Sequence, residues 1–178
     1  MMAHDHCCSG EVSAPSVCQT LDELQFERGI WSAALNGEVD KVKDHLSKGV
    51  NPNSNDSSGY TPLHYASRNG YLKVCQILLD NGAEVNMPTK SGSSTALHRS
   101  AMRGHLDVVN LLLGRGADAK LRDADGKTSL HKAVENGRPD VCKVLIKACP
   151  ESVTFTDNKN KKPIDYASDN SYIMSLFN

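Results

Sequence analysis

The chain has 178 residues, of which 39% are hydrophobic and 5% aromatic. This length suits one compact domain or one short solenoid, and the low aromatic content fits a core of Leu, Val, Ile and Ala on small helices. Twenty Lys and Arg residues against 21 Asp and Glu give a formal net charge of −1. That balance argues against a general attraction to nucleic acid or to a membrane, and we expect neither as a partner.

The first residues are polar and have no hydrophobic period, which predicts a disordered N-terminal tail over 1–19. They contain no apolar stretch of the roughly 7–15 residues that a secretory leader needs. No part of the chain approaches the roughly 18 consecutive apolar residues of a membrane helix. We therefore expect a reducing compartment, cytoplasmic and/or nuclear, in which the six cysteines stay free thiols.

The tail contains one candidate metal cluster, formed by His4, His6, Cys7 and Cys8. Structural zinc sites use two ligands about two to four residues apart, together with a second such pair. Adjacent cysteines fit this spacing poorly, and the sequence has no second pair. We expect no metal and no other cofactor, and metal binding by the tail stays an alternative.

A short helix is predicted over 20–27, directly after the tail. Thr20 and Glu23 have the spacing of a capping box, in which each side chain accepts the backbone N–H of the other residue. Leu21 and Leu24 would lie on one face of this helix. We expect that face to cover the exposed end of the segment that follows.

A repeat of 33 or 34 residues dominates the remainder of the chain. Thr61-Pro62-Leu63-His64 recurs as Thr95-Ala96-Leu97-His98 and as Thr128-Ser129-Leu130-His131. A glycine follows each copy at a fixed distance, at Gly70, Gly104 and Gly137, and a Leu-rich run comes next. Such a fixed period indicates a repeat architecture, in which each unit buries its apolar face against its neighbours.

The period, the tetrapeptide, the glycines and the Leu-rich run together resemble the ankyrin repeat, a turn followed by two antiparallel helices. The resemblance implies an all-α ankyrin-repeat solenoid of about five helix-turn-helix repeats with short turn hairpins, spanning 28–178. The predicted units are 28–60, 61–94, 95–127, 128–161 and a truncated cap at 162–178. Atypical first and last units are expected, because the ends of a stack need a polar outer face.

The same resemblance implies a non-catalytic protein–protein interaction module that binds an unidentified protein on its concave face. We use "concave face" for the turn tips together with the exposed side of each first helix. The candidate contact residues are Leu35, Asn36, Tyr60, Arg68, Asn69, Met102, Arg103, Glu135 and Asn136. Tyr and Arg often anchor interfaces, and Met adapts to irregular surfaces. These positions are exposed in any ankyrin protein, so a merely solvated surface is the competing interpretation. The chain itself is expected to be monomeric.

One turn is irregular. The segment from Asn86 to Thr95 has one residue more than the corresponding segments from Asn53 to Thr61 and from Lys120 to Thr128, so an extra residue lies within 87–94. The same turn has Thr89 where its neighbours have Asp. We expect this tip to project differently, either as a specificity element or as tolerated surface variation.

The remaining chemistry is predicted to be structural. His64, His98 and His131 share one repeat position, which favours rings bonded to the turn backbone over a joint catalytic site. Cys75 and Cys142 share a second-helix position with Val109, which favours burial. The chain lacks the common nucleotide-binding, zinc-protease and serine-hydrolase motifs, and we predict that it is not an enzyme.

A modification site is the other alternative. Glu84-Val85-Asn86, with Leu78 eight residues before Asn86, resembles the ankyrin sites that are hydroxylated by an oxygen-sensing asparagine hydroxylase. The resemblance implies that Asn86 could be a substrate. Asn is also an ordinary turn residue, because it tolerates left-handed backbone geometry.

Overall fold

The computed structural model describes residues 26–167 and 170–177. Within these ranges the regular structure is helical, without a β-strand. The helices are α2 (Ile30–Asn36), α3 (Val39–Ser47), α4 (Pro62–Asn69), α5 (Leu72–Asp80), α6 (Ala96–Arg103), α7 (Leu106–Gly114), α8 (Ser129–Glu135), α9 (Pro139–Ala148) and α10 (Ser171–Ser175), with 3-10 turns η1 (Pro150–Thr154) and η2 (Pro163–Tyr166). The predicted all-α repeat stack is therefore confirmed.

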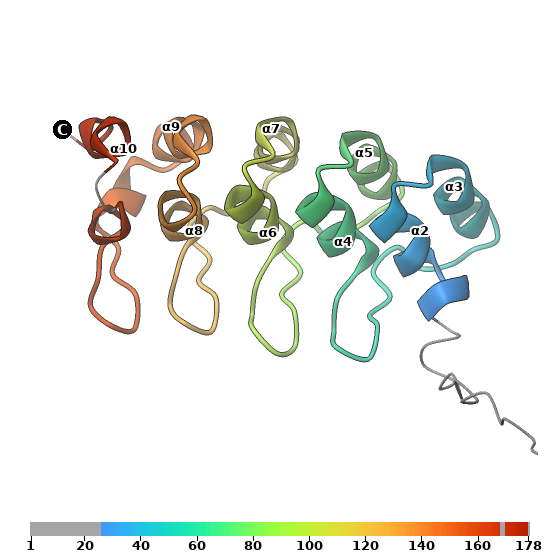
Figure 1. The fold of residues 1–178 in the computed structure, drawn as a ribbon. Coiled ribbons are helices and arrows are strands. Elements are labelled where there is room, and N and C mark those ends of the chain that lie inside the picture. Colours follow the sequence, from blue (N-terminus) through green and yellow to red (C-terminus); the bar gives the residue numbers. More distant parts are fainter. Residues whose placement is uncertain (1–25, 168–169, 178) are drawn as a thin grey trace, which may run out of the picture.

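The helices form two parallel rows, and the long turns project from the same side of the stack (Figure 1). Helices α2, α4, α6, α8 and then η2 make the row nearer the turns, each packing on the next. Helices α3, α5, α7, α9 and α10 make the second row. The chain thus stacks neighbour on neighbour, as its repeat period predicts.

Tetrapeptide residues start the first helix of each central repeat. Thr61 is the N-cap of α4 and Pro62 is its first residue, where the missing N–H of proline leaves no helical bond unmade. Thr61 and His64 form a capping box at the start of α4. Thr95 with His98 and Thr128 with His131 form the same box at α6 and α8. The tetrapeptide is therefore a helix-start signal that three repeats share.

Glycine is the C-cap of α4 and α6, where the chain reverses sharply. Gly70 has φ 79°, in the left-handed region that L residues with a side chain avoid. A Cβ at this position would also lie 2.5 Å from Nδ1 of His105 in the next repeat. Both constraints require glycine here, so the reversal between α4 and α5 and the contact between repeats depend on one residue.

The core is a ladder of leucines. Each central repeat buries one Leu of the first helix and one of the second at 1% exposure or less, namely Leu63 and Leu78, Leu97 and Leu112, and Leu130 and Leu145. Burying such a side chain stabilises the fold by about 1.5–3 kcal/mol. Small residues such as Ala66, which is fully buried, let the first helices approach closely.

The N-terminal predictions lie mainly outside the described residues. The tail 1–19, with its candidate metal cluster, and residues 20–25 of the predicted capping helix are not covered by the described ranges. Phe26, at the end of that predicted helix, contacts Tyr65 edge-to-face with 5.5 Å between ring centroids. The division of the chain into units and tail stays a prediction.

Candidate partner-binding surface

The long turns are closed by one side chain at a fixed position. Each repeat is counted from here on as a long turn together with the helices that follow it, so the second to fifth repeats begin at the turns of Asp56, Thr89, Asp123 and Asp157. In the second repeat, Asp56 Oδ1 accepts the backbone N–H groups of Ser58 and Tyr60 at 2.9 and 2.8 Å. Asp123 accepts the equivalent pair of N–H groups in the fourth repeat, and Asp157 in the fifth. A carboxylate that accepts two backbone donors substitutes for turn hydrogen bonds and fixes the tip.

The second carboxylate oxygen binds a side chain nine residues later, on the first helix or on η2. We call each turn residue and its helix partner a brace. The braces are Asp56 with Tyr65 (2.5 Å), Asp123 with Lys132 (2.7 Å) and Asp157 with Tyr166. Each brace joins a turn tip to the first helix, or to η2, of its own repeat.

The third repeat departs from this arrangement. Thr89 Oγ1 accepts the N–H of Ser94 at 3.1 Å, and the two residues are five apart, whereas Asp56 and Tyr60 are four apart. The extra residue of this turn therefore lies between Thr89 and Ser94. Ser93 takes up the left-handed backbone conformation, with φ 47°, which Gly59 adopts in the second turn.

Arg99 occupies the position on α6 that Tyr65 and Lys132 occupy in their braces, and the turn of its repeat has Thr89 in place of an aspartate. Its Nη2 donates to Tyr60 Oη at 2.5 Å, and its guanidinium carbon lies 4.9 Å from the centre of the Tyr60 ring. Its Nε is buried without a hydrogen-bond partner in the described part of the chain. The guanidinium thus retains unused donors beside the concave face.

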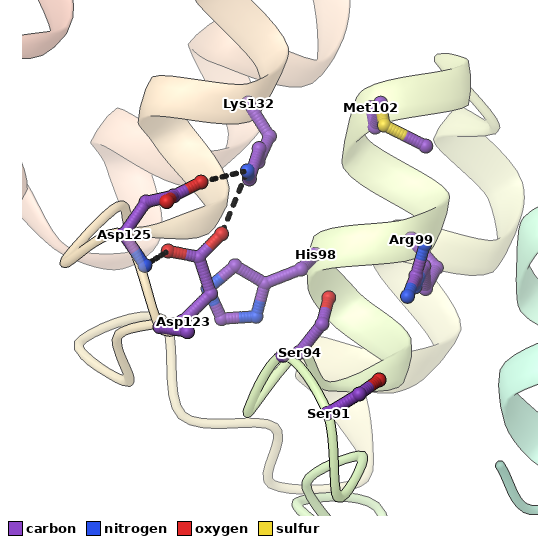
Figure 2. A pocket seen from close by; sticks show the side chains of 10 residues that line it. Ser91, Ser94, His98, Arg99, Met102, Asp123, Asp125 and Lys132 are labelled. Atoms are coloured by element: carbon purple, nitrogen blue, oxygen red, sulfur yellow. Dashed lines mark hydrogen bonds and ion pairs between the residues drawn. The ribbon is translucent and has the colours of Figure 1, made fainter. Parts of the chain in front are cut away.

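A hollow of about 290 Å³ lies between the third and fourth turns (Figure 2). Its lining consists of Ser91, Gly92, Ser94, His98, Arg99, Met102, Asp123, Ala124, Asp125 and Lys132. Lys132 points at Asp123 and Asp125, with 2.7 and 3.9 Å between Nζ and the carboxylates. Arg99 and Met102 lie along α6, and no acidic group of the lining is drawn beside them. This volume fits one or two side chains better than a bound cofactor.

A family model for ankyrin repeats, in three copies, matches residues 30–123 and again residues 97–176. The chain belongs to the ankyrin repeat family. The two overlapping matches together span residues 30–176, which include all the helix pairs, turns and braces described above.

The chain is similar to ankyrin repeat domain-containing protein 39. The human protein is 54% identical over 83 residues, which is 47% of this chain and 45% of the relative. The Bos taurus protein is 63% identical over 65 residues, or 36% of each chain. The matched segments thus span less than half of either relative. SMC5-SMC6 complex localization factor protein 1 of Bos taurus is 31% identical over 176 residues, but these make up 14% of that protein.

The ankyrin stack places the predicted contact residues in two groups. Asn36, Arg68, Asn69, Arg103, Glu135 and Asn136 are exposed, whereas Leu35, Tyr60 and Met102 are partly buried. Met102 lines the hollow. Tyr60 packs on Tyr65, with 5.5 Å between ring centroids, and receives Arg99 on its face.

Several of these side chains already have partners within the molecule. Asn69 Nδ2 donates to the backbone carbonyl of Leu35 at 2.7 Å and so links two repeats. Glu135 is paired with Lys127 at 2.7 Å. No ion pair joins Arg68 or Arg103 to a carboxylate in the described ranges. The two arginines are therefore the most available of the predicted contacts.

The list of predicted contacts lacks Arg99 and Lys132, which line the hollow. A signal for both was present in the sequence, because each follows the helix N-cap by four residues, where the second repeat has Tyr65. Aligning the repeats of this chain with one another shows which positions are equivalent. It does not show that Lys132 is neutralised by a turn carboxylate while Arg99 is not.

The repeated histidines are structural. The N–H of Thr61 donates to Nδ1 of His64 at 3.1 Å, so Nδ1 carries no proton, and Nε2–H donates to the carbonyl of Ser94 at 3.0 Å. His98 and His131 repeat this bridge to the next turn. Burial lowers the pKa of His64 to about 4 and also lowers the pKa values of His98 and His131. Each neutral ring thereby holds the turn of the following repeat.

The cysteine prediction is also confirmed for the helix positions. Cys75 and Cys142 are fully buried, like their repeat counterpart Val109. Burial raises the pKa of the Cys75 thiol to about 11 and that of Cys142 to about 12. Since the thiolate is the reactive form, both side chains act as small core residues.

Metal and membrane sites can be assessed only for the described ranges. There, no three His, Cys, Asp or Glu side chains gather in a way that would hold a metal ion. None of the helices in these ranges combines the length and hydrophobicity needed to cross a bilayer. The predicted cluster of His4, His6, Cys7 and Cys8 lies outside them.

Asn86 links neighbouring repeats. Its Nδ2 donates to the carbonyl of Gly116 at 3.1 Å, and its Oδ1 accepts the N–H of Asp118 at 2.9 Å. Asn53 makes the same two bonds one repeat earlier. Both polar atoms of the exposed Asn86 side chain are therefore engaged between repeats. Hydroxylation stays a prediction, which mass spectrometry of peptides from cells would test by an added oxygen at this residue.

Proposed function

We propose that this ankyrin protein is a non-catalytic adaptor that binds a partner protein along its concave face. Ankyrin repeats are generally protein–protein interaction modules, and repeat stacks use their extended surfaces for such contacts. The observation that carries the proposal is the position of Met102 and Arg99 on α6. Both line a hollow at the concave face, and Arg99 keeps unused donors there.

The chemistry of the hollow supports binding over catalysis. Both ring nitrogens of His98 are occupied, by the N–H of Thr95 and the carbonyl of Lys127. Lys132 is paired with Asp123. A general base or nucleophile needs a free, correctly protonated atom facing the substrate, and these groups are committed to the fold.

The test is affinity capture from cells with the full chain and a double charge reversal. We expect R68E/R103E to lose a captured protein that the wild-type chain retains, because both arginines are exposed and lack ion pairs. The matched control is K43E/K73E, which reverses two exposed charges on the second-row helices α3 and α5.

Circular dichroism should show that both variants stay folded. Binding that survives R68E/R103E and disappears in K43E/K73E would place the interface on the opposite face and contradict the proposal. A cytoplasmic or nuclear location and a monomeric state remain predictions. Microscopy of the tagged chain and analytical ultracentrifugation would check them.

A further inference from the structure

The three braces differ in charge from the equivalent positions of the third repeat, Thr89 and Arg99. Asp56 with Tyr65 and Asp157 with Tyr166 each bring one negative charge, and Asp123 with Lys132 is neutral. In the third repeat both members have changed. Thr89 is neutral and Arg99 is positive, so these two positions together have a charge of +1.

No ion pair in the described structure joins Arg99 to a carboxylate. The ion pairs of the fourth repeat bind its lysines to its own acidic side chains, and none involves Arg99. Arg68 and Arg103 lie on the same pair of repeats without an ion pair as well. The second and third repeats therefore present three arginines without an ion pair on the concave face, against the single negative charge of Asp56.

The surroundings of Arg99 hold the guanidinium in place. The Tyr60 ring packs against it, Tyr60 Oη accepts one of its five N–H donors, and the buried Nε has no partner. A side chain fixed in this way loses little conformational freedom on binding, and a guanidinium fork matches the geometry of a carboxylate.

We infer that the hollow at Arg99 binds an acidic side chain, Asp or Glu, of the partner protein, whose carboxylate serves Arg99 as Asp123 serves Lys132 in the fourth repeat. The inference rests on the proposed function and names the chemistry of the partner. The ligand oxygens accept from Arg99, and its methylene groups contact Met102, which lines the same hollow.

The probe is N-acetyl-glutamate methylamide, with the uncharged glutamine analogue as its isosteric control. Both are titrated into the full chain while the Nε–H resonance of Arg99, assigned by its loss in R99Q, and the Met102 methyl resonance are followed by NMR. We expect saturable shifts with the glutamate probe at millimolar concentration and at least tenfold weaker binding of the glutamine analogue.

Restoring the missing aspartate gives a variant that should fold well and still lose the site. In T89D the new carboxylate would pair with Arg99, as Asp123 pairs with Lys132, so we expect at least a tenfold loss of affinity for the glutamate probe. The control S57D adds the same charge on the exposed tip of the second turn and should bind as the wild-type chain does.

Equal affinity for the two probes, or unchanged glutamate binding in T89D, would overturn the inference. If a captured protein depends on Arg68 and Arg103 while the glutamate probe shifts neither resonance, the inference fails and the proposed function stands. If the probe binds as expected and no protein depends on the concave face, the carboxylate site stands and the proposed function fails.

Discussion

The third and fourth turns solve the same structural problem with different chemistry. In the fourth turn, Asp123 accepts two backbone N–H groups and binds Lys132. In the third turn, Thr89 accepts one N–H, and the cation of the helix, Arg99, turns instead to Tyr60 of the preceding repeat. The fold therefore tolerates a turn without a carboxylate, and the positive charge of Arg99 then lies beside the concave face without an ion pair.

The largest effect in this comparison is expected from D123A. The Asp123 side chain is 6% exposed and accepts two backbone donors and one ammonium. Its removal should lower the free energy of unfolding by about 3 kcal/mol, because a partly buried lysine and two N–H groups lose their partner. Urea denaturation followed by circular dichroism measures this loss. A loss below about 1 kcal/mol would show that the fourth turn does not depend on its carboxylate.

Acid should weaken the histidine bridges that hold both turns. His64, which binds the third turn, has a pKa of about 4 in the folded chain, whereas an unfolded histidine titrates near 6.5. The unfolded chain therefore binds more protons between these values, so stability is complete above about pH 7 and falls as the pH drops toward 4. We expect His64 alone to cost about 2 kcal/mol at pH 5 relative to pH 7.

Urea denaturation across this pH range tests the bridges, and the variant H64Q should show a smaller loss between pH 7 and pH 5 than the wild-type chain. H45Q, which removes a histidine of α3 outside the bridges, should keep the wild-type slope. Stability that stays constant from pH 7 to pH 5 would contradict the bridging role.

A smaller effect is expected from T89A, the counterpart of D123A in the third turn. Thr89 is 2% exposed, and its hydroxyl accepts a single N–H, from Ser94. Loss of this bond should cost about 1 kcal/mol in the free energy of unfolding. If T89A and D123A were equally destabilising, the proposed difference between the two turns would be wrong.

The smallest effect concerns the extra residue of the third turn. Ser93 has φ 47°, so S93G should relieve left-handed strain and stabilise the chain by about 0.5 kcal/mol. N160G is the matched control in the fifth turn. Asn160 has φ 58°, but asparagine tolerates this region, so the gain should be smaller. Thermal unfolding of both variants checks the order, and a larger gain in N160G would contradict it.

Much of the fold was predictable because it depends on residues at fixed, short spacings within each repeat. The tetrapeptide marks a helix start, and Gly70 sits where the chain reverses with φ 79°. The shared positions of Cys75, Cys142 and Val109 predicted their burial. Each of these signals concerns one repeat or the period itself, so a single sequence contains the information.

The candidate site was predicted less well. Met102 lines the hollow, Tyr60 is half-buried beneath Arg99, and Asn69 links two repeats. Residues at equivalent positions of the repeats were all expected to be exposed. Contacts between neighbouring repeats make their actual exposure differ. Arg99 was not among the predicted contacts, because its environment depends on residues in other repeats.

The sequence by itself determined the repeat period, the helix pairs and the turn with one extra residue, since these follow from short-range patterns of capping residues, glycines and leucines. Only the tertiary structure decided which charges are neutralised. Arg99 meets Tyr60, 39 residues earlier, while Lys132 meets a carboxylate of its own repeat. The physical reason is that stacking sets which side chains of neighbouring repeats touch, and a charge becomes available for a partner when that geometry leaves it without a counterion.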